Sequence, residues 1–283
     1  MVCRAPAVAL VVLAACSARD AADGAGGAGA SAAGAPAGGA SAAGAPTGGA
    51  SAAGAPAGGG AGTAVLVFTK TAGYRHDSIA IGISALATLG AERGWSLEST
   101  EDAGRFEDTT LERFDVVVFL NTSGDVLDAD QQSAFERFVR AGRGFVGVHA
   151  ASDTEYDWPW YGGLVGAYFR AHPEVQRAAI QVEDATHPAT RHLPARLERT
   201  DEWYAFRTNP RPDVHVLLTL DESSYTAGAA AMGGDHPLAW FHEYDGGRAF
   251  YTALGHTRES YAEPAFLEHL AGAVTWAARA GDP

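Results

Sequence analysis

Residues 116–148 read VVVFLNTSGDVLDADQQSAFERFVRAGRGFVGV, and this stretch decides the fold class. It opens with an apolar run at residues 116–120 and closes with another at residues 144–148, each of which predicts a buried strand. Between them, apolar side chains recur at helical spacing and predict a helix over residues 128–141. A strand, a helix and a strand in this order form the unit from which parallel sheets are built.

The same alternation continues on both sides of this stretch. The further predicted elements are strands at residues 64–68, 96–100, 179–182, 214–220, 239–244 and 249–253, and helices at residues 78–93 and 264–279. Buried strands that alternate with amphipathic helices predict a three-layer, flavodoxin-like α/β fold, in which helices cover both faces of a mostly parallel sheet. We expect one domain over residues 63–280, with a partly antiparallel extension of the sheet beyond about residue 175.

Charge and cysteine content exclude several functions. The 283 residues carry a formal net charge of −14, and the few charged residues before Gly62 cancel, so the imbalance belongs to the predicted domain. An acidic surface without a basic run excludes nucleic acid as the expected partner. Both cysteines, Cys3 and Cys16, precede the domain, which therefore has no disulfide, thiolate ligand or cysteine nucleophile.

The first 62 residues differ in composition from the rest. Residues 1–16 have a short basic start, an apolar run and the ending Leu-Ala-Ala-Cys, which looks like a bacterial lipobox and predicts a lipoprotein signal peptide with lipidation at Cys16. An ordinary secretory peptide is the alternative. Residues 17–62 contain a repeat of Gly, Ala, Ser and Pro without large apolar side chains, which predicts a disordered tether. We expect an exported protein that contacts the membrane only through its anchor.

Histidines follow three of the predicted strands. Because ligands of an open parallel sheet bind outside the carboxyl ends of its strands, His76, His149 and His256 are expected to converge. Asp153 and Glu202 supply nearby carboxylates. Neutral imidazoles with one carboxylate suit both general base catalysis and a divalent metal such as zinc, so we predict one catalytic site with the three histidines as metal ligands. The alternative is that each histidine only satisfies loop backbone.

Aromatic and basic residues near these segments indicate a saccharide ligand, whose apolar faces stack on aromatic rings. The candidate substrate-binding residues are Arg75, Trp158, Trp160, Trp203, Tyr204 and Arg258. Other histidines, including His172, His187 and His269, are interpreted as structural. The sequence has no Gly-x-Ser-x-Gly elbow, Gly-rich phosphate loop or His-Glu-x-x-His helix, which excludes the corresponding enzyme classes.

Five short segments carry a resemblance to a known family. They read RHDS at 75–78, GFVGVHA at 144–150, THP at 186–188, DEWY at 201–204 and ALGHT at 253–257. In this order they resemble the ThuA-like (trehalose utilisation) domain over residues 63–280. The resemblance implies a class I glutamine amidotransferase-like fold. Such amidotransferases carry a catalytic cysteine at the elbow where this chain has His149, so glutaminase chemistry is not expected.

The resemblance also implies a role in disaccharide metabolism through oxidised 3-keto sugars. We expect a protein that acts on such a glycoside as a hydrolase, lyase or isomerase. The alternative is a noncatalytic carbohydrate-binding or accessory domain. Either one would be expected to work beside a sugar dehydrogenase.

Overall fold

The structure is a computed structural model that describes residues 62–280. The expected signal peptide, Cys16 and nearly all of the expected tether lie outside the described residues. Within residues 62–280, no helix has both the length and the apolar character needed to span a bilayer.

A single mixed sheet forms the centre of the fold, with the strand order β2-β1-β3-β4-β11-β10-β9-β6-β7. The strands are β1 (Ala64–Phe68), β2 (Ser96–Thr100), β3 (Val116–Leu120), β4 (Gly144–Val148), β6 (Gln176–Val182), β7 (Arg196–Asp201), β9 (His215–Leu220), β10 (Pro237–Tyr244) and β11 (Gly247–Thr252). The five strands from β2 to β11 pair in parallel, and the four from β10 to β7 continue the sheet antiparallel. The predicted mostly parallel sheet with an antiparallel extension is confirmed.

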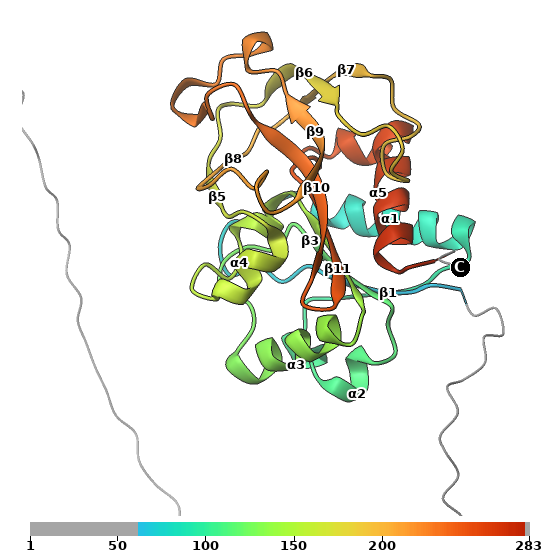
Figure 1. Ribbon diagram of the computed structural model, residues 1–283. Helices are drawn as coiled ribbons and strands as arrows, with labels where there is room; N and C mark the ends of the chain where they lie inside the picture. The colour runs from blue at the N-terminus through green and yellow to red at the C-terminus, as the bar shows by residue number, and fades with distance from the viewer. Residues whose placement is uncertain (1–61, 281–283) are drawn as a thin grey trace, which may run out of the picture. The chain divides into compact units, whose positions relative to one another are not determined.

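Helices cover both faces of this sheet. Figure 1 shows α1 (Ile79–Arg93) and α5 (Pro264–Ala277) together on one side, and α2 (Asp108–Leu111), α3 (Ala129–Arg140) and α4 (Pro159–Val165) on the other. The three-layer α/β architecture is therefore as predicted. The sequence did not predict α2, α4, β7 or the small separate sheet of β5 (Phe169–Ala171) and β8 (Ala205–Phe206), because these segments are short and mixed in polarity.

The central strands are buried because helices cover both of their faces. Every residue of β3 and β4 is buried. Phe119 of β3 stacks on Phe135 of α3, with ring centroids 5.4 Å apart. On the other face, a Cβ at Gly144 would lie 2.4 Å from the carbonyl oxygen of Ala277, so only glycine lets the end of α5 pack this closely on β4.

The parallel pairing brings the carboxyl ends of β1, β4 and β11 to one edge of the sheet. The loops that leave these ends carry His76, His149 and His256 in turn. Residue Glu202 follows the edge strand β7. The fold thus places four segments that are distant in sequence around one position.

Candidate active site

His149 occupies a strained elbow directly after β4. Its φ of 49° lies in the left-handed region, which a residue with a Cβ rarely adopts and which is typical of functional turns. The side chain is fully buried, and Nδ1 lies 2.8 Å from the carbonyl oxygen of Ala253. Because a carbonyl only accepts, Nδ1 donates its proton to Ala253, and Nε2 is left to face the other members of the site. This is the orientation in which histidine binds a metal.

Three further side chains meet His149. Nε2 of His149 lies 3.2 Å from Nδ1 of His256 and 3.4 Å from Oε2 of Glu202, and the last two atoms are 3.0 Å apart. The His76 ring stands edge to face with both other imidazoles, at centroid distances of 4.9 and 5.1 Å. One candidate ligand atom from each of these residues lies within 4.8 Å of the others. We call His76, His149, Glu202 and His256 the histidine cluster.

Burial and charge set the protonation of this cluster. Burial, together with the nearby His149 and His256, lowers the pKa of His76 to about 3, so its imidazole is neutral. Burial alone would raise the pKa of Glu202, but hydrogen bonds and charge from His149 and His256 outweigh it and lower that pKa well below its usual range. Burial likewise opposes ionisation of His256, yet hydrogen bonding to Glu202 raises its pKa. The cluster therefore combines an anionic carboxylate, from Glu202, with a neutral imidazole, from His76.

The residues present fit a divalent metal ion. Three imidazoles and one carboxylate form an ordinary set of ligands for zinc. Nδ1 of His76 is buried and has no hydrogen-bond partner among the described residues, so this nitrogen is available to a ligand. Nε2 of His149 is oriented by the bond from Nδ1 to Ala253.

A buried ion pair beneath the cluster fixes two of its members. Oδ1 of Asp201 accepts hydrogen bonds from the backbone N–H groups of Glu202 and His256, at 3.0 and 3.2 Å. Oδ2 accepts from the backbone of Gly255 at 3.0 Å and lies 3.2 Å from the guanidinium of Arg199. Asp201 thus joins β7 to the loop after β11. No sequence pattern pointed to Arg199, or to Asp201 as a support.

The cluster opens into a cavity of about 390 Å³. It is lined by Tyr74, His76, Asp153, His172, Glu174, Val175, Glu202, Tyr204 and His256. The expected residue Tyr204 packs its ring on His149, with centroids 3.9 Å apart. The expected residue Asp153 accepts a hydrogen bond of 2.6 Å from the hydroxyl of Tyr156, and burial raises its pKa. A carboxyl group with a raised pKa suits proton transfer near neutral pH.

His172 belongs to the site, which corrects its interpretation as purely structural. It follows β5, and its Nδ1 lies 2.9 Å from Oε1 of Glu202. The other carboxylate oxygen, Oε2, faces His149. No sequence signal pointed to it, because β5 has only three residues and no periodicity. Its approach to Glu202 is a product of the tertiary fold.

The three tryptophans do not line this cavity, which corrects the expectation of a tryptophan platform. Trp203 is fully buried, and its Nε1 donates to the carbonyl of Gln176. Trp158 and Trp160 stack on each other near α4, and their Nε1 atoms donate to Glu136 and Asp245. Their rings serve packing at the start of α4: Trp160 packs on Phe135 of α3, and Trp158 stacks on Tyr161.

The two expected arginines also lie outside the cavity lining. Arg75 is exposed and forms a bidentate pair with Glu101, with its shorter contact at 2.6 Å. Arg258 is exposed at the start of a short 3₁₀ turn.

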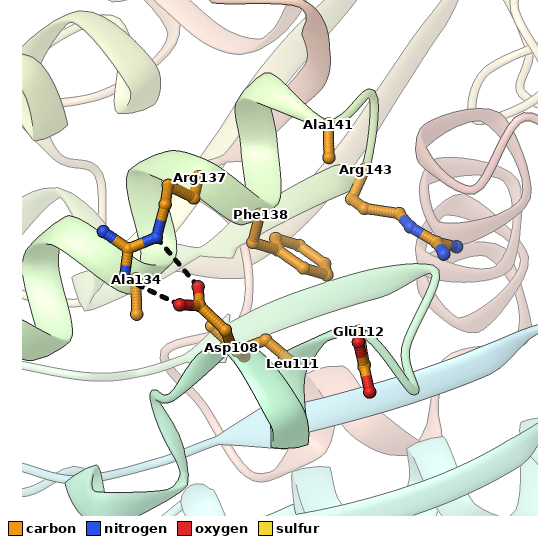
Figure 2. Close-up of a pocket in the computed structure, with 8 residues that line it drawn as sticks. All are labelled: Asp108, Leu111, Glu112, Ala134, Arg137, Phe138, Ala141 and Arg143. Carbon is orange, nitrogen blue, oxygen red and sulfur yellow. Dashed lines mark hydrogen bonds and ion pairs between the residues drawn. The ribbon is translucent and has the colours of Figure 1, made fainter. Parts of the chain in front are cut away.

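A second cavity, of about 190 Å³, lies between α2 and α3 (Figure 2). Two of its polar side chains pair with each other: Arg137 donates two hydrogen bonds to Asp108, at 2.9 and 3.0 Å. Arg143 donates to Asp115, which does not line the cavity. This leaves no convergent polar groups comparable with the histidine cluster. We therefore assign the candidate site to the edge of the sheet.

Several solved structures have a fold similar to that of this chain. A ThuA-like protein from Bacteroides uniformis has 25% sequence identity and a TM-score of 0.66, with 79% of this chain and 95% of that chain covered. A ThuA-like protein from Parabacteroides merdae has 19% identity and a TM-score of 0.64, covering 77% and 90%. A β-galactosidase from Bacillus circulans has 13% identity and a TM-score of 0.51, covering 76% and 31%. The last two similarities concern the fold alone.

No curated protein sequence matches the chain significantly. The family model described as ThuA, trehalose utilisation, matches residues 64–277, which includes every strand of the sheet and all members of the histidine cluster. This chain therefore belongs to the ThuA (trehalose utilisation) family.

Proposed function

We propose that this protein cleaves an oxidised, 3-keto glycoside at a site that holds a divalent metal ion. The observation that carries the proposal is the convergence of His76, His149, His256 and Glu202, with candidate ligand atoms within 4.8 Å of one another, at the floor of a cavity. The family relationship supports a saccharide as the small molecule. A zinc-like ion held there would supply a positive charge that stabilises an enolate oxygen.

The proposed reaction uses the acidity of a carbon next to a ketone. A base removes the proton from C2 of the 3-keto sugar, and the electrons form an enolate on the C3 oxygen. The enolate collapses, the C1–O bond breaks, and the leaving alcohol takes up a proton. The products are an unsaturated keto sugar and an alcohol, and addition of water to C1 would complete a hydrolysis.

Asp153 fits the role of the base. It lines the cavity beside the cluster, and burial raises its pKa, which makes the carboxylate a stronger proton acceptor. Tyr156, which donates to Oδ1 of Asp153, holds the carboxylate in place. A sugar dehydrogenase would be the partner that supplies the keto group.

The test combines metal content and turnover of 3-keto-trehalose. We expect His149→Ala and His256→Ala to lose bound zinc and most turnover, while His215→Ala, which changes an exposed histidine on β9, retains both. Full turnover in both cluster variants, at parental melting temperatures, would contradict the proposed catalysis. Saccharide binding without turnover in the parent protein would support the noncatalytic alternative.

We further propose that the chain is exported and anchored through Cys16. The support is the lipobox-like ending of residues 1–16 and the Gly, Ala, Ser and Pro composition of residues 17–62. Cys16→Ser should move the protein from the membrane fraction to the soluble fraction. An unchanged membrane fraction would refute the anchor.

A further inference from the structure

Two apolar side chains stand exposed at the mouth of the active-site cavity. Among the described residues, the exposed large hydrophobic side chains are Tyr74, with 66% of its surface accessible, and Val175, with 42%. Both line the cavity above the histidine cluster. They come from loops about a hundred residues apart, so their meeting at one rim is not a local sequence effect. Exposed apolar surface that gathers at a cavity indicates a binding surface.

The two ends of the cavity differ in exposure. At the floor, His76 and Glu202 are 4% and 7% exposed, and His149 is fully buried. Tyr74 lies next to the floor: its ring contacts the ring of His76 edge to face, at a centroid distance of 4.8 Å. A sugar unit that reacts at the cluster must therefore fill the floor. The next unit of the same molecule would lie between Tyr74 and Val175.

We propose that Tyr74 and Val175 form an outer subsite for the second unit of a glycoside. This inference rests on the proposed function and adds the residues that would contact the second unit of the glycoside. The aromatic ring and the valine methyl groups suit the apolar C–H face of a pyranose. Glu174, which lines the same cavity beside Val175, supplies a carboxylate for the hydroxyl groups.

The main chain fixes this arrangement. The hydroxyl of Ser123, just after β3, donates to the carbonyl oxygen of Tyr74 at 2.6 Å, and the backbone N–H of Gly73 donates to the carbonyl of Ser123 at 3.1 Å. Val175 precedes β6 directly, in a segment that Gln176 joins to Thr226 by two hydrogen bonds. Both side chains are therefore presented from anchored backbone.

The test compares two substrates that differ only in the second unit, 3-keto-trehalose and methyl 3-keto-α-glucoside. Tyr74→Ala should raise KM for the disaccharide relative to the methyl glycoside by about threefold to tenfold, which is the range for loss of one aromatic contact. The kcat for the disaccharide should change little, since the reacting groups remain. Tyr74→Phe keeps the ring and should restore the KM ratio, and Val175→Thr should shift it in the same direction as Tyr74→Ala.

Trp160→Phe is the matched control, because Trp160 is an aromatic residue outside the cavity and hydrogen-bonded to Asp245. It should leave the KM ratio unchanged. An equal change of KM for both substrates in Tyr74→Ala, or no change for either, would overturn the outer subsite while leaving the proposed catalysis standing.

A binding measurement separates this inference from the proposed reaction. Titration calorimetry with trehalose and methyl α-glucoside requires no turnover. Tighter binding of trehalose by the parent protein, lost in Tyr74→Ala and kept in Tyr74→Phe, would support the subsite even if no keto glycoside were cleaved. Equal binding of both ligands, or binding of neither, would overturn it.

Discussion

Glu202 and His149 come from distant strands and meet in the site: Oε2 of Glu202, after the edge strand β7, lies 3.4 Å from Nε2 of His149, after the central strand β4. Glu202 is the only carboxylate in the cluster defined above. Glu202→Gln keeps the shape of the side chain but removes its charge. We expect zinc affinity to fall at least tenfold, measured by competition with a chromogenic chelator.

Glu198→Gln is the control for this change. Glu198 also lies on β7, but it is exposed and pairs with Arg177 at 2.6 Å. Its variant should bind zinc as the parent does. Parental zinc affinity in Glu202→Gln would remove Glu202 from the ligand set.

Three histidines of the site were predictable, because they follow β1, β4 and β11, whose apolar runs have clear ends. Parallel pairing then brings His76, His149 and His256 to one edge of the sheet. Such reasoning needs only local pattern and the rule for open sheets. It brings the three histidines together because the strands before them are evident from sequence.

The remainder of the site depends on tertiary contacts that no local pattern contains. The strand before Glu202, RLERTD, reads as polar and was not predicted. Its Arg199 is buried and is paired there with Asp201 of the same strand and with Ser260, which is distant in sequence but close in the fold. The tryptophans failed as a prediction for the opposite reason: an aromatic residue fits both a core and a binding surface, and composition does not distinguish them.

The second prediction concerns Asp201, which accepts a hydrogen bond from the backbone of His256. In Asp201→Asn, the amide group would place a donor against the N–H groups that Asp201 now accepts from, and Arg199 would lose its buried partner. We expect the free energy of unfolding to fall by about 3–5 kcal/mol, measured by urea denaturation. The control is Asp108→Asn on the surface (Figure 2), where a solvent-exposed pair contributes little. Equal effects of the two variants would contradict the buried network.

The third prediction is that alanine at two helix glycines changes the free energy of unfolding in opposite directions. A Cβ at Gly272 in α5 would lie 2.4 Å from the carbonyl group of Pro188, so Gly272→Ala must push α5 away from that turn. We expect a loss of about 1–3 kcal/mol in the free energy of unfolding. At Gly90 in α1 the nearest atom is 3.7 Å away, so Gly90→Ala should stabilise by up to about 1 kcal/mol through helix propensity. Thermal and urea unfolding measure both, and destabilisation by Gly90→Ala would contradict the packing seen here.

The same turn predicts acid sensitivity of the fold. Two buried histidines bind the backbone of Ala189. Nδ1 of His187 accepts from its N–H at 3.1 Å, and Nδ1 of His269 donates to its carbonyl at 2.8 Å. Burial lowers the pKa of His187 to about 4 and that of His269 to about 3. Both imidazoles are therefore neutral in the folded protein at pH values where they are protonated in the unfolded chain.

The sign of the pH effect follows from this difference. Above about pH 6.5, the ordinary histidine pKa, neither state binds these protons and stability does not depend on them. As the pH falls from 6.5 towards 4, only the unfolded chain takes up the protons, so each histidine lowers stability by up to about 1.4 kcal/mol per pH unit.

His269→Asn tests this effect, because its side-chain amide can still donate to the carbonyl of Ala189 but does not titrate. Urea denaturation at pH 7, 6, 5 and 4 should show a smaller loss of stability on acidification than in the parent, with a further reduction when His187→Asn is added. At pH 7 the variants need only remain folded, because the comparison is between slopes. Parallel pH curves for parent and double variant would show that these histidines do not cause the acid sensitivity.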